Sequence, residues 1–149
     1  MNKKNLMIAG ALGAALSLAV AGGAALAHHA FAAEFDGKAP VLLRGKVTRV
    51  EWINPHAWVH VANVNPDGTT TAWMVEGGTP NTLLRSGIDR NSLKAGQEII
   101  VRGYQSKDRL CRPACKANGR DVTFPDGKKL FMGSSGTGAP KDGSDATEK

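Results

Sequence analysis

The sequence predicts a mainly β protein, a small OB-fold-like barrel of five or six strands with one short helix between strands three and four. Runs rich in β-branched residues alternate between apolar and polar positions, as in half-buried strands. Turn signals such as Asn65-Pro66-Asp67-Gly68 separate these runs, and one helix-start signal follows the third run. This order of elements is that of an OB-fold. Another small barrel or a sandwich could use the same strands.

Each expected element has a local signal. The expected strands are 41–52, 56–64, 69–76, 98–105 and 117–124, with a short sixth strand at 128–132. Gly45 interrupts the first strand, which is typical of a bulge or a tight bend in a curved sheet. Thr79-Pro80-Asn81 supplies a capping hydroxyl and a proline in the first helical position, and Gly87 ends that helix. Residues 89–93 are a second, shorter helical candidate.

Both ends of the 149-residue chain differ from its middle. Residues 1–27 have the features of a secretory signal peptide: Lys3 and Lys4, an apolar run, and the cleavage pattern Ala25-Leu26-Ala27. A transmembrane anchor is the alternative, but the run is rich in Gly and Ala and no charged stop follows it. We therefore expect a lead segment at 28–40, helical or extended, a barrel domain at 41–132 and a disordered tail at 133–149.

Export places the protein in the periplasm or outside the cell. Removal of Lys3 and Lys4 lowers the net charge from +6 to +4, and the remaining basic residues are scattered. The expected partner is an envelope protein or a small ligand, with no stable membrane insertion after the leader is removed. Nucleic acid is not expected, because the sequence has neither a phosphate-cradling glycine pattern nor an aromatic-basic RNA-binding motif.

The two cysteines favour a structural disulfide. Cys111 and Cys115 lie close together in the sequence of an exported protein, so a bond closing a short loop is the first interpretation. Cu(I) binding by the thiolates, or cycling between dithiol and disulfide, remain alternatives. Catalysis is not expected, since no nucleophile signature such as G-x-S-x-G and no motif with paired acids is present.

The candidate ligand-binding surface lies at the turn before the second strand and along that strand. Strand alternation places His56, Trp58 and His60 on one face, and Val59 and Val61 on the opposite face, which is the expected core side. The candidate ligand-binding residues are Trp52, Asn54, His56, Trp58 and His60. Tryptophans in such a barrel either form an aromatic platform for a ligand or fill the core and its rim. The basic loop from 107 to 116 is expected to flank this surface.

A copper or zinc site is the alternative function. Cleavage after Ala27 would leave His28 at the N-terminus with a free amine, and imidazole and amine nitrogens suit Cu and Zn. The candidate ligands are His28, His29, His56, His60 and Glu76. Strand residues four apart are about 13 Å apart along the axis at about 3.3 Å per residue, so one ion should pair either His56 or His60 with the terminal histidines. The competing interpretation is that His56 caps the turn and Glu76 holds the following helix N-terminus.

The sequence also resembles a family of small exported bacterial proteins known only as a domain of unknown function. The matching segments span about residues 28–135 and are His28-His29-Ala30-Phe31, Phe35-Asp36, the run from Val50 to Trp58, Val75-Glu76-Gly77-Gly78 with Pro80-Asn81 and Leu83-Leu84, and Leu130-Phe131 with Gly133-Ser134-Ser135. The resemblance implies no established activity. The Cys111-Arg112-Pro113-Ala114-Cys115 insertion departs from the family pattern.

Overall fold

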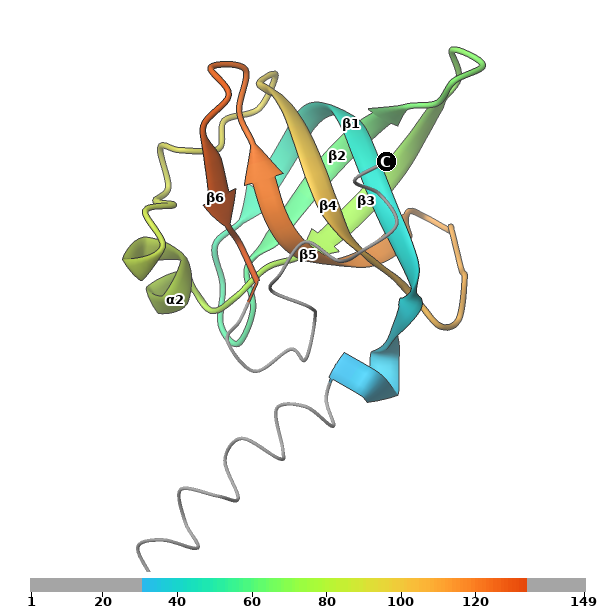
Figure 1. Cartoon of the computed structure of the whole chain (residues 1–149), viewed down its shortest axis with the longest axis horizontal. Helices are drawn as coiled ribbons and strands as arrows, with labels where there is room; N and C mark the ends of the chain where they lie inside the picture. The colour runs from blue at the N-terminus through green and yellow to red at the C-terminus, as the bar shows by residue number, and fades with distance from the viewer. Residues whose placement is uncertain (1–30, 134–149) are drawn as a thin grey trace, which may run out of the picture.

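A computed structural model describes residues 31–133 of the chain (Figure 1). The predicted leader at 1–27, His28, His29 and the tail from residue 134 lie outside the described residues. The elements are β1 (Phe35–Glu51), β2 (Trp58–Val64), β3 (Thr70–Glu76), α2 (Pro80–Arg85), β4 (Glu98–Ser106), β5 (Cys115–Thr123) and β6 (Lys129–Phe131). No helix within 31–133 is long and apolar enough to cross a bilayer.

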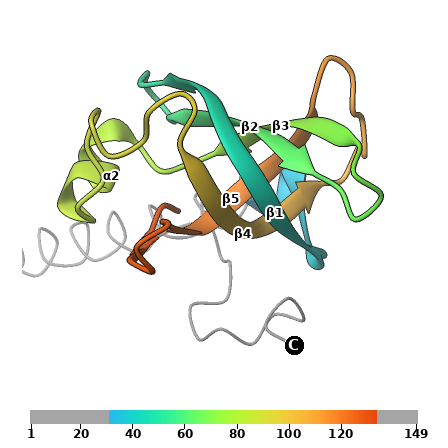
Figure 2. The same ribbon diagram turned by 90° about the horizontal axis from the view of Figure 1, so that it is seen from above.

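The strands pair in a closed ring. The sheet order is β3-β2-β1-β4-β5-β6, and β3 also pairs with β5. The β3–β5 pairing is parallel, whereas the others are antiparallel. The predicted mainly β, OB-like fold with one short helix between strands three and four is therefore confirmed. In the view from above, α2 lies to one side of the crossing strands (Figure 2).

β1 is long and is shared between two neighbours. Its register pairs Gly45 with Asn63 of β2 and also with Ile99 of β4, so Gly45 lies where the two ladders overlap. A Cβ atom at Gly45 would lie 1.9 Å from the carbonyl oxygen of Ala62. Only a residue without a side chain allows β1 and β2 to approach so closely here. The irregularity in the β1–β2 register lies between Val47 and Arg49 and not at Gly45, where a bulge or tight bend was expected.

β1 begins at Phe35, earlier than the predicted start at residue 41. Phe35 pairs with Ser106 and is 2% exposed, and its ring lies 5.8 Å from that of Phe31. The sequence between Phe35 and Pro40 has little apolar periodicity, which explains why the strand was expected to start later. Part of the lead segment is thus strand, and residues 31–34 are helical.

Alternate residues of β2 are buried, which confirms the predicted alternation of this strand. Val59 and Val61 are each 1% exposed, and full burial of such a side chain contributes about 1.5–3 kcal/mol. Trp73 also belongs to the core rather than to an exposed platform. Thr79 caps α2 by accepting a hydrogen bond from the amide of Thr82, as its position before Pro80 predicted. Residues 89–93 form turns instead of the expected second helical piece.

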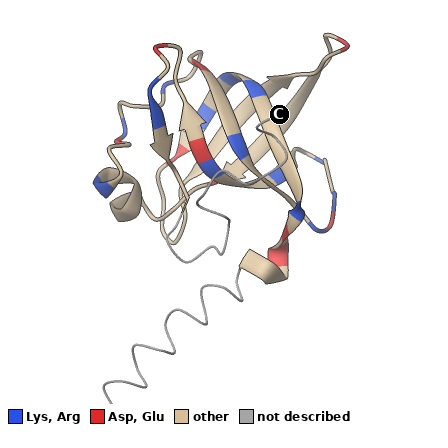
Figure 3. Cartoon of the chain, in the orientation of Figure 1, with Lys and Arg blue, Asp and Glu red and all other residues tan. Residues whose placement is uncertain are grey.

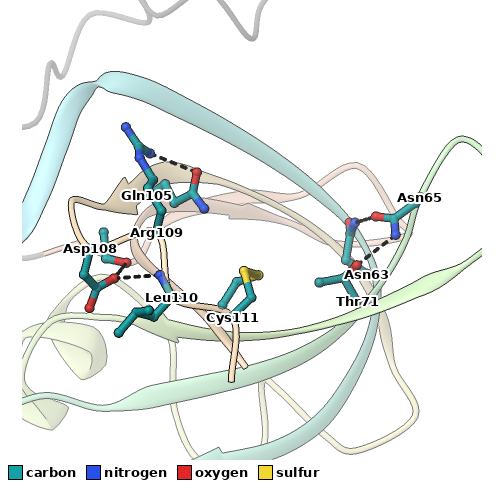
Figure 4. Close-up of a disulfide and its surroundings, with 10 residues drawn as sticks. Asn63, Asn65, Thr71, Gln105, Asp108, Arg109, Leu110 and Cys111 are labelled. Carbon is teal, nitrogen blue, oxygen red and sulfur yellow. Dashed lines mark hydrogen bonds between the residues drawn. A yellow bond between two sulfur atoms is a disulfide. The ribbon is translucent and has the colours of Figure 1, made fainter. Parts of the chain in front are cut away.

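The predicted disulfide is present in the loop before β5. Cys111 and Cys115 are bonded, with Cα atoms 3.7 Å apart. Figure 4 shows the loop around them, in which the Asp108 carboxylate accepts hydrogen bonds from the Ser106 hydroxyl at 2.7 Å and the Leu110 amide at 3.1 Å. The bond anchors the loop to the first residue of β5.

Candidate functional site

The loop before β2 is held by the glycine pair that follows β3. The amide of Ala57 donates to the carbonyl of Gly78 at 3.1 Å, and the amide of Gly77 donates back to the carbonyl of Ala57 at 2.8 Å. Ala57 is completely buried, and a Cβ atom on Gly78 would lie 2.9 Å from the carbonyl oxygen of Gly133. These contacts fix the backbone directly after His56.

His56 lies against a buried carboxylate. Its Nδ1 atom is 2.9 Å from Oε1 of Glu76, whose side chain is 9% exposed, whereas the His56 side chain is 36% exposed. The strand registers explain the meeting, since Trp58 pairs with Glu76 and Glu76 pairs with Asn118 of β5. The Asn118 amide group donates to the same Glu76 oxygen at 3.3 Å. Glu76 therefore holds His56 and does not cap α2, whose cap is Thr79.

The surroundings of Glu76 shift its titration. Burial raises the pKa of the Glu76 carboxyl above its usual value. The charge and hydrogen bond of His56 oppose that rise in pKa, and so does the hydrogen bond from Asn118. The charge of Glu34 adds to the rise in pKa. The Oδ1 atom of Asn118 is buried and accepts no hydrogen bond from the described residues. A polar group left unpaired in this way is uncommon in a folded protein.

The hydrogen bond to Glu76 determines what His56 can do. A neutral imidazole that donates from Nδ1 to a carboxylate keeps the lone pair of Nε2 for another partner. The same second-shell arrangement orients and strengthens histidine ligands of metals. The geometry therefore presents one oriented nitrogen acceptor at a half-exposed position.

Trp58 lies beside His56 on the outer face of β2 and is half-buried. The ammonium group of Lys116 lies over its ring, 5.9 Å from the ring centre. Lys116 also forms an ion pair with Glu34 at 2.6 Å, and this hydrogen bond raises the pKa of Lys116. The predicted outward position of Trp58 is confirmed, and one cation covers part of the indole.

His60 faces a different neighbour. Its Nε2 atom is 2.9 Å from Oε1 of Glu51 and 3.1 Å from the Arg49 guanidinium. Arg49 and Glu51 also form an ion pair on the same strand. The structure thus directs His56 toward β3 and His60 toward β1, so these two histidines do not meet. Of the other predicted residues, Trp52 packs against the core and Asn54 is exposed.

The candidate metal ligands are only partly placed. Within residues 31–133, no group of three or more His, Cys, Asp and Glu side chains is arranged to hold a metal ion. His56 and Glu76 form a pair, and His60 lies elsewhere. His28 and His29, which would have to complete a metal site, lie outside the described residues.

The basic loop contacts the lead segment. Arg109 forms an ion pair with Asp36 at 2.6 Å, and Lys107 donates its backbone amide to the carbonyl of Glu34 at 2.9 Å. The Lys107 ammonium also donates to the carbonyl of Ala32. Acidic positions of the lead segment and basic positions of this loop lie at the same end of the molecule (Figure 3). Sequence reasoning missed this contact, although the opposite charges of the two segments were a usable signal.

The ring of strands, the anchored loop and the oriented His56 define a small OB-like β protein with a histidine–carboxylate pair on its outer face. The chain belongs to a family of unknown function, DUF6152, whose model matches residues 15–112. The expected resemblance to a domain of unknown function is thereby confirmed. The matched region contains His56, Trp58 and Glu76, whereas Cys115 and Asn118 lie beyond it. No curated protein and no solved structure matches the chain.

Proposed function

We propose that the protein is a non-catalytic, exported binding module that holds its ligand through the Nε2 atom of His56. The observation that carries the proposal is the 2.9 Å contact between His56 Nδ1 and the buried Glu76 carboxylate. This contact orients the ring and leaves Nε2 as the acceptor. The periplasm or the extracellular space is the proposed location, on the basis of the leader sequence.

Copper or zinc is the ligand that fits this arrangement best. A neutral imidazole backed by a carboxylate is a ligand for either metal. The first described residue, Phe31, packs edge-on against Tyr104 with ring centres 5.8 Å apart, and Tyr104 pairs with Asn118 beside Glu76. His28 and His29 precede Phe31 by three and two residues. An extended chain covers about 7–10 Å over that separation. Removal of the leader would therefore supply two imidazoles and an amine within reach of this face.

A metal titration tests the proposal on protein that begins at His28. Cu(II) and Zn(II) binding is measured by calorimetry for the wild type, for His56→Gln, and for a version with one extra residue before His28. His60→Gln is the matched control, because His60 is held by Glu51 and Arg49. Loss of one ligand should weaken binding in His56→Gln and leave His60→Gln unchanged. Equal affinity of His56→Gln and wild type would contradict the proposal.

A small organic ligand or an envelope protein is the second candidate. It is favoured by the half-exposed Trp58 ring and by Ile53, a large apolar residue of the preceding loop that is 50% exposed. Aromatic residues of this kind contribute strongly to binding. If this candidate is correct, Trp58→Ala should keep the thermal unfolding transition and lose the partner, whereas His56→Gln should have the smaller effect.

A further inference from the structure

An open groove lies beside Gly45 of β1, away from the proposed His56 site. Its volume is about 780 Å³, within the usual size range of small-molecule sites. The registers of the sheet place its walls side by side, because Arg44 pairs with Ile100 and Ile100 pairs with Thr123. Val64 and Thr70, which pair at the end of the β2–β3 hairpin, line the same groove. The groove therefore spans several strands of the ring.

The walls of the groove are mainly hydrocarbon. Its apolar lining residues are Ala62, Val64, Ile99, Ile100, Phe124 and Pro125. Val64 is 56% exposed, although it stands in a strand whose other face belongs to the core. A concave surface lined in this way gains free energy when an apolar chain displaces water from it.

The cations of the groove come from one strand. Arg44 and Lys46 both point to the groove side of β1, and the Arg44 side chain forms no ion pair with any residue in 31–133. Lys46 approaches Glu98 at 3.9 Å, but both side chains are largely exposed. Two cations and one carboxylate leave the groove with one positive charge. Such a site suits a ligand that carries a single negative charge.

We propose that this groove binds a free amphiphilic monoanion, namely a carboxylate with an unbranched aliphatic chain. The carboxylate would pair with the Arg44 guanidinium, whose planar donors match its two oxygens. The chain would lie along Val64, Ile100 and Phe124. An inorganic anion would leave these apolar walls in water, and an uncharged amphiphile would not use Arg44. The inference is independent of the proposed function, because it uses none of the residues of the His56 site.

Calorimetry with dodecanoate below its micelle concentration tests this assignment. Wild type should bind dodecanoate more tightly than dodecanol. Arg44→Glu should weaken dodecanoate binding roughly tenfold to a hundredfold, the usual effect of losing a hydrogen-bonded charge. Val64→Glu, which puts a carboxylate on the apolar wall, should weaken it as well. Arg112→Glu is the matched control, since it makes the same charge change on the disulfide loop, and it should leave binding unchanged.

Amide chemical shifts locate the ligand, and thermal unfolding shows that each variant is folded. Shifts that change at Val64 and Ile100, with those of Trp58 unchanged, support the groove. Equal binding of dodecanol and dodecanoate, or full affinity in folded Arg44→Glu, would overturn the assignment. Binding only to phosphatidylglycerol vesicles, with no binding of free dodecanoate, would overturn it in favour of a membrane surface.

Discussion

Replacing Glu76 by glutamine separates the role of its charge from the role of its shape. In the wild type, His56 Nδ1 lies 2.9 Å from Oε1 of Glu76. Glutamine keeps an oxygen that can accept the same hydrogen bond. The charge that strengthens the imidazole as a ligand is lost. Substitution of such an outer partner of a metal-binding histidine lowers metal affinity by about 10- to 100-fold. We expect that loss in a Cu(II) or Zn(II) titration of Glu76→Gln.

The same variant predicts a dependence of stability on pH in the metal-free protein. Burial raises the pKa of Glu76 in the folded state above its ordinary value of 4.5. The fold thus favours the protonated carboxyl, so this contribution to stability is complete below pH 4.5 and is lost as the pH rises through the folded-state pKa. Because glutamine does not titrate, the free energy of unfolding of wild type minus that of Glu76→Gln should fall as the pH rises.

Urea denaturation at a series of pH values measures this difference. Glu76→Ala is the companion variant, and it should be less stable than Glu76→Gln by about 1–3 kcal/mol, since it leaves the buried Asn118 amide without its acceptor. A wild type that gains stability over Glu76→Gln between acid and neutral pH would refute the reasoning, because it would mean that the charged form of Glu76 is favoured by folding.

Three further changes test the fold around the site. Gly45→Ala should cost at least about 1–3 kcal/mol in urea denaturation, because its Cβ atom would lie 1.9 Å from the Ala62 carbonyl oxygen; an unchanged midpoint would contradict the close approach of the strands. The Lys116–Glu34 pair raises the pKa of Lys116, so its stabilisation of the lead segment is present below pH 10.5 and is lost as Lys116 deprotonates at higher pH. Hydrogen exchange of the Glu34 amide at pH 9 should be faster in Lys116→Met than in wild type, and equal rates would argue against the pair. Cys111→Ser should lower the free energy of unfolding by no more than about 2 kcal/mol, because the closed loop is short, and a larger loss in denaturation would show that the disulfide organises more than its loop.

Local patterns were sufficient to predict the strands and their faces. The alternation around Val59 and Val61 identified the core side, and both residues are buried. The turn signal ending at Gly68, which has a φ of +81°, joins β2 and β3 as a hairpin. That hairpin pairs Val64 with Thr70 and, by counting back, Trp58 with Glu76. The position of Glu76 opposite Trp58 could thus have been predicted from the turn alone.

The rest of the site depends on contacts between distant segments. Asn118 reaches Glu76 only through the parallel pairing of β3 with β5, whose register no local pattern specifies. The early start of β1 depends on Phe35 packing into the core, and on ion pairs between the lead segment and a loop more than seventy residues away. The direction of the His56 ring follows from Glu76, so a reading of β2 alone could not assign it.

Closure of the ring affects how readily copies of the protein associate at high concentration. In an open sheet the last part of β3 would be an exposed edge, but here it pairs with β5. Within residues 31–133, the edges that remain include β6, a strand of three residues that begins with Lys129, and the first part of β3, which pairs only with β2. Short edge strands that carry a lysine pair poorly with strands of other molecules. Pairing with β5 and the shortness of β6 therefore disfavour fibril-like self-association through the last part of β3 and through β6.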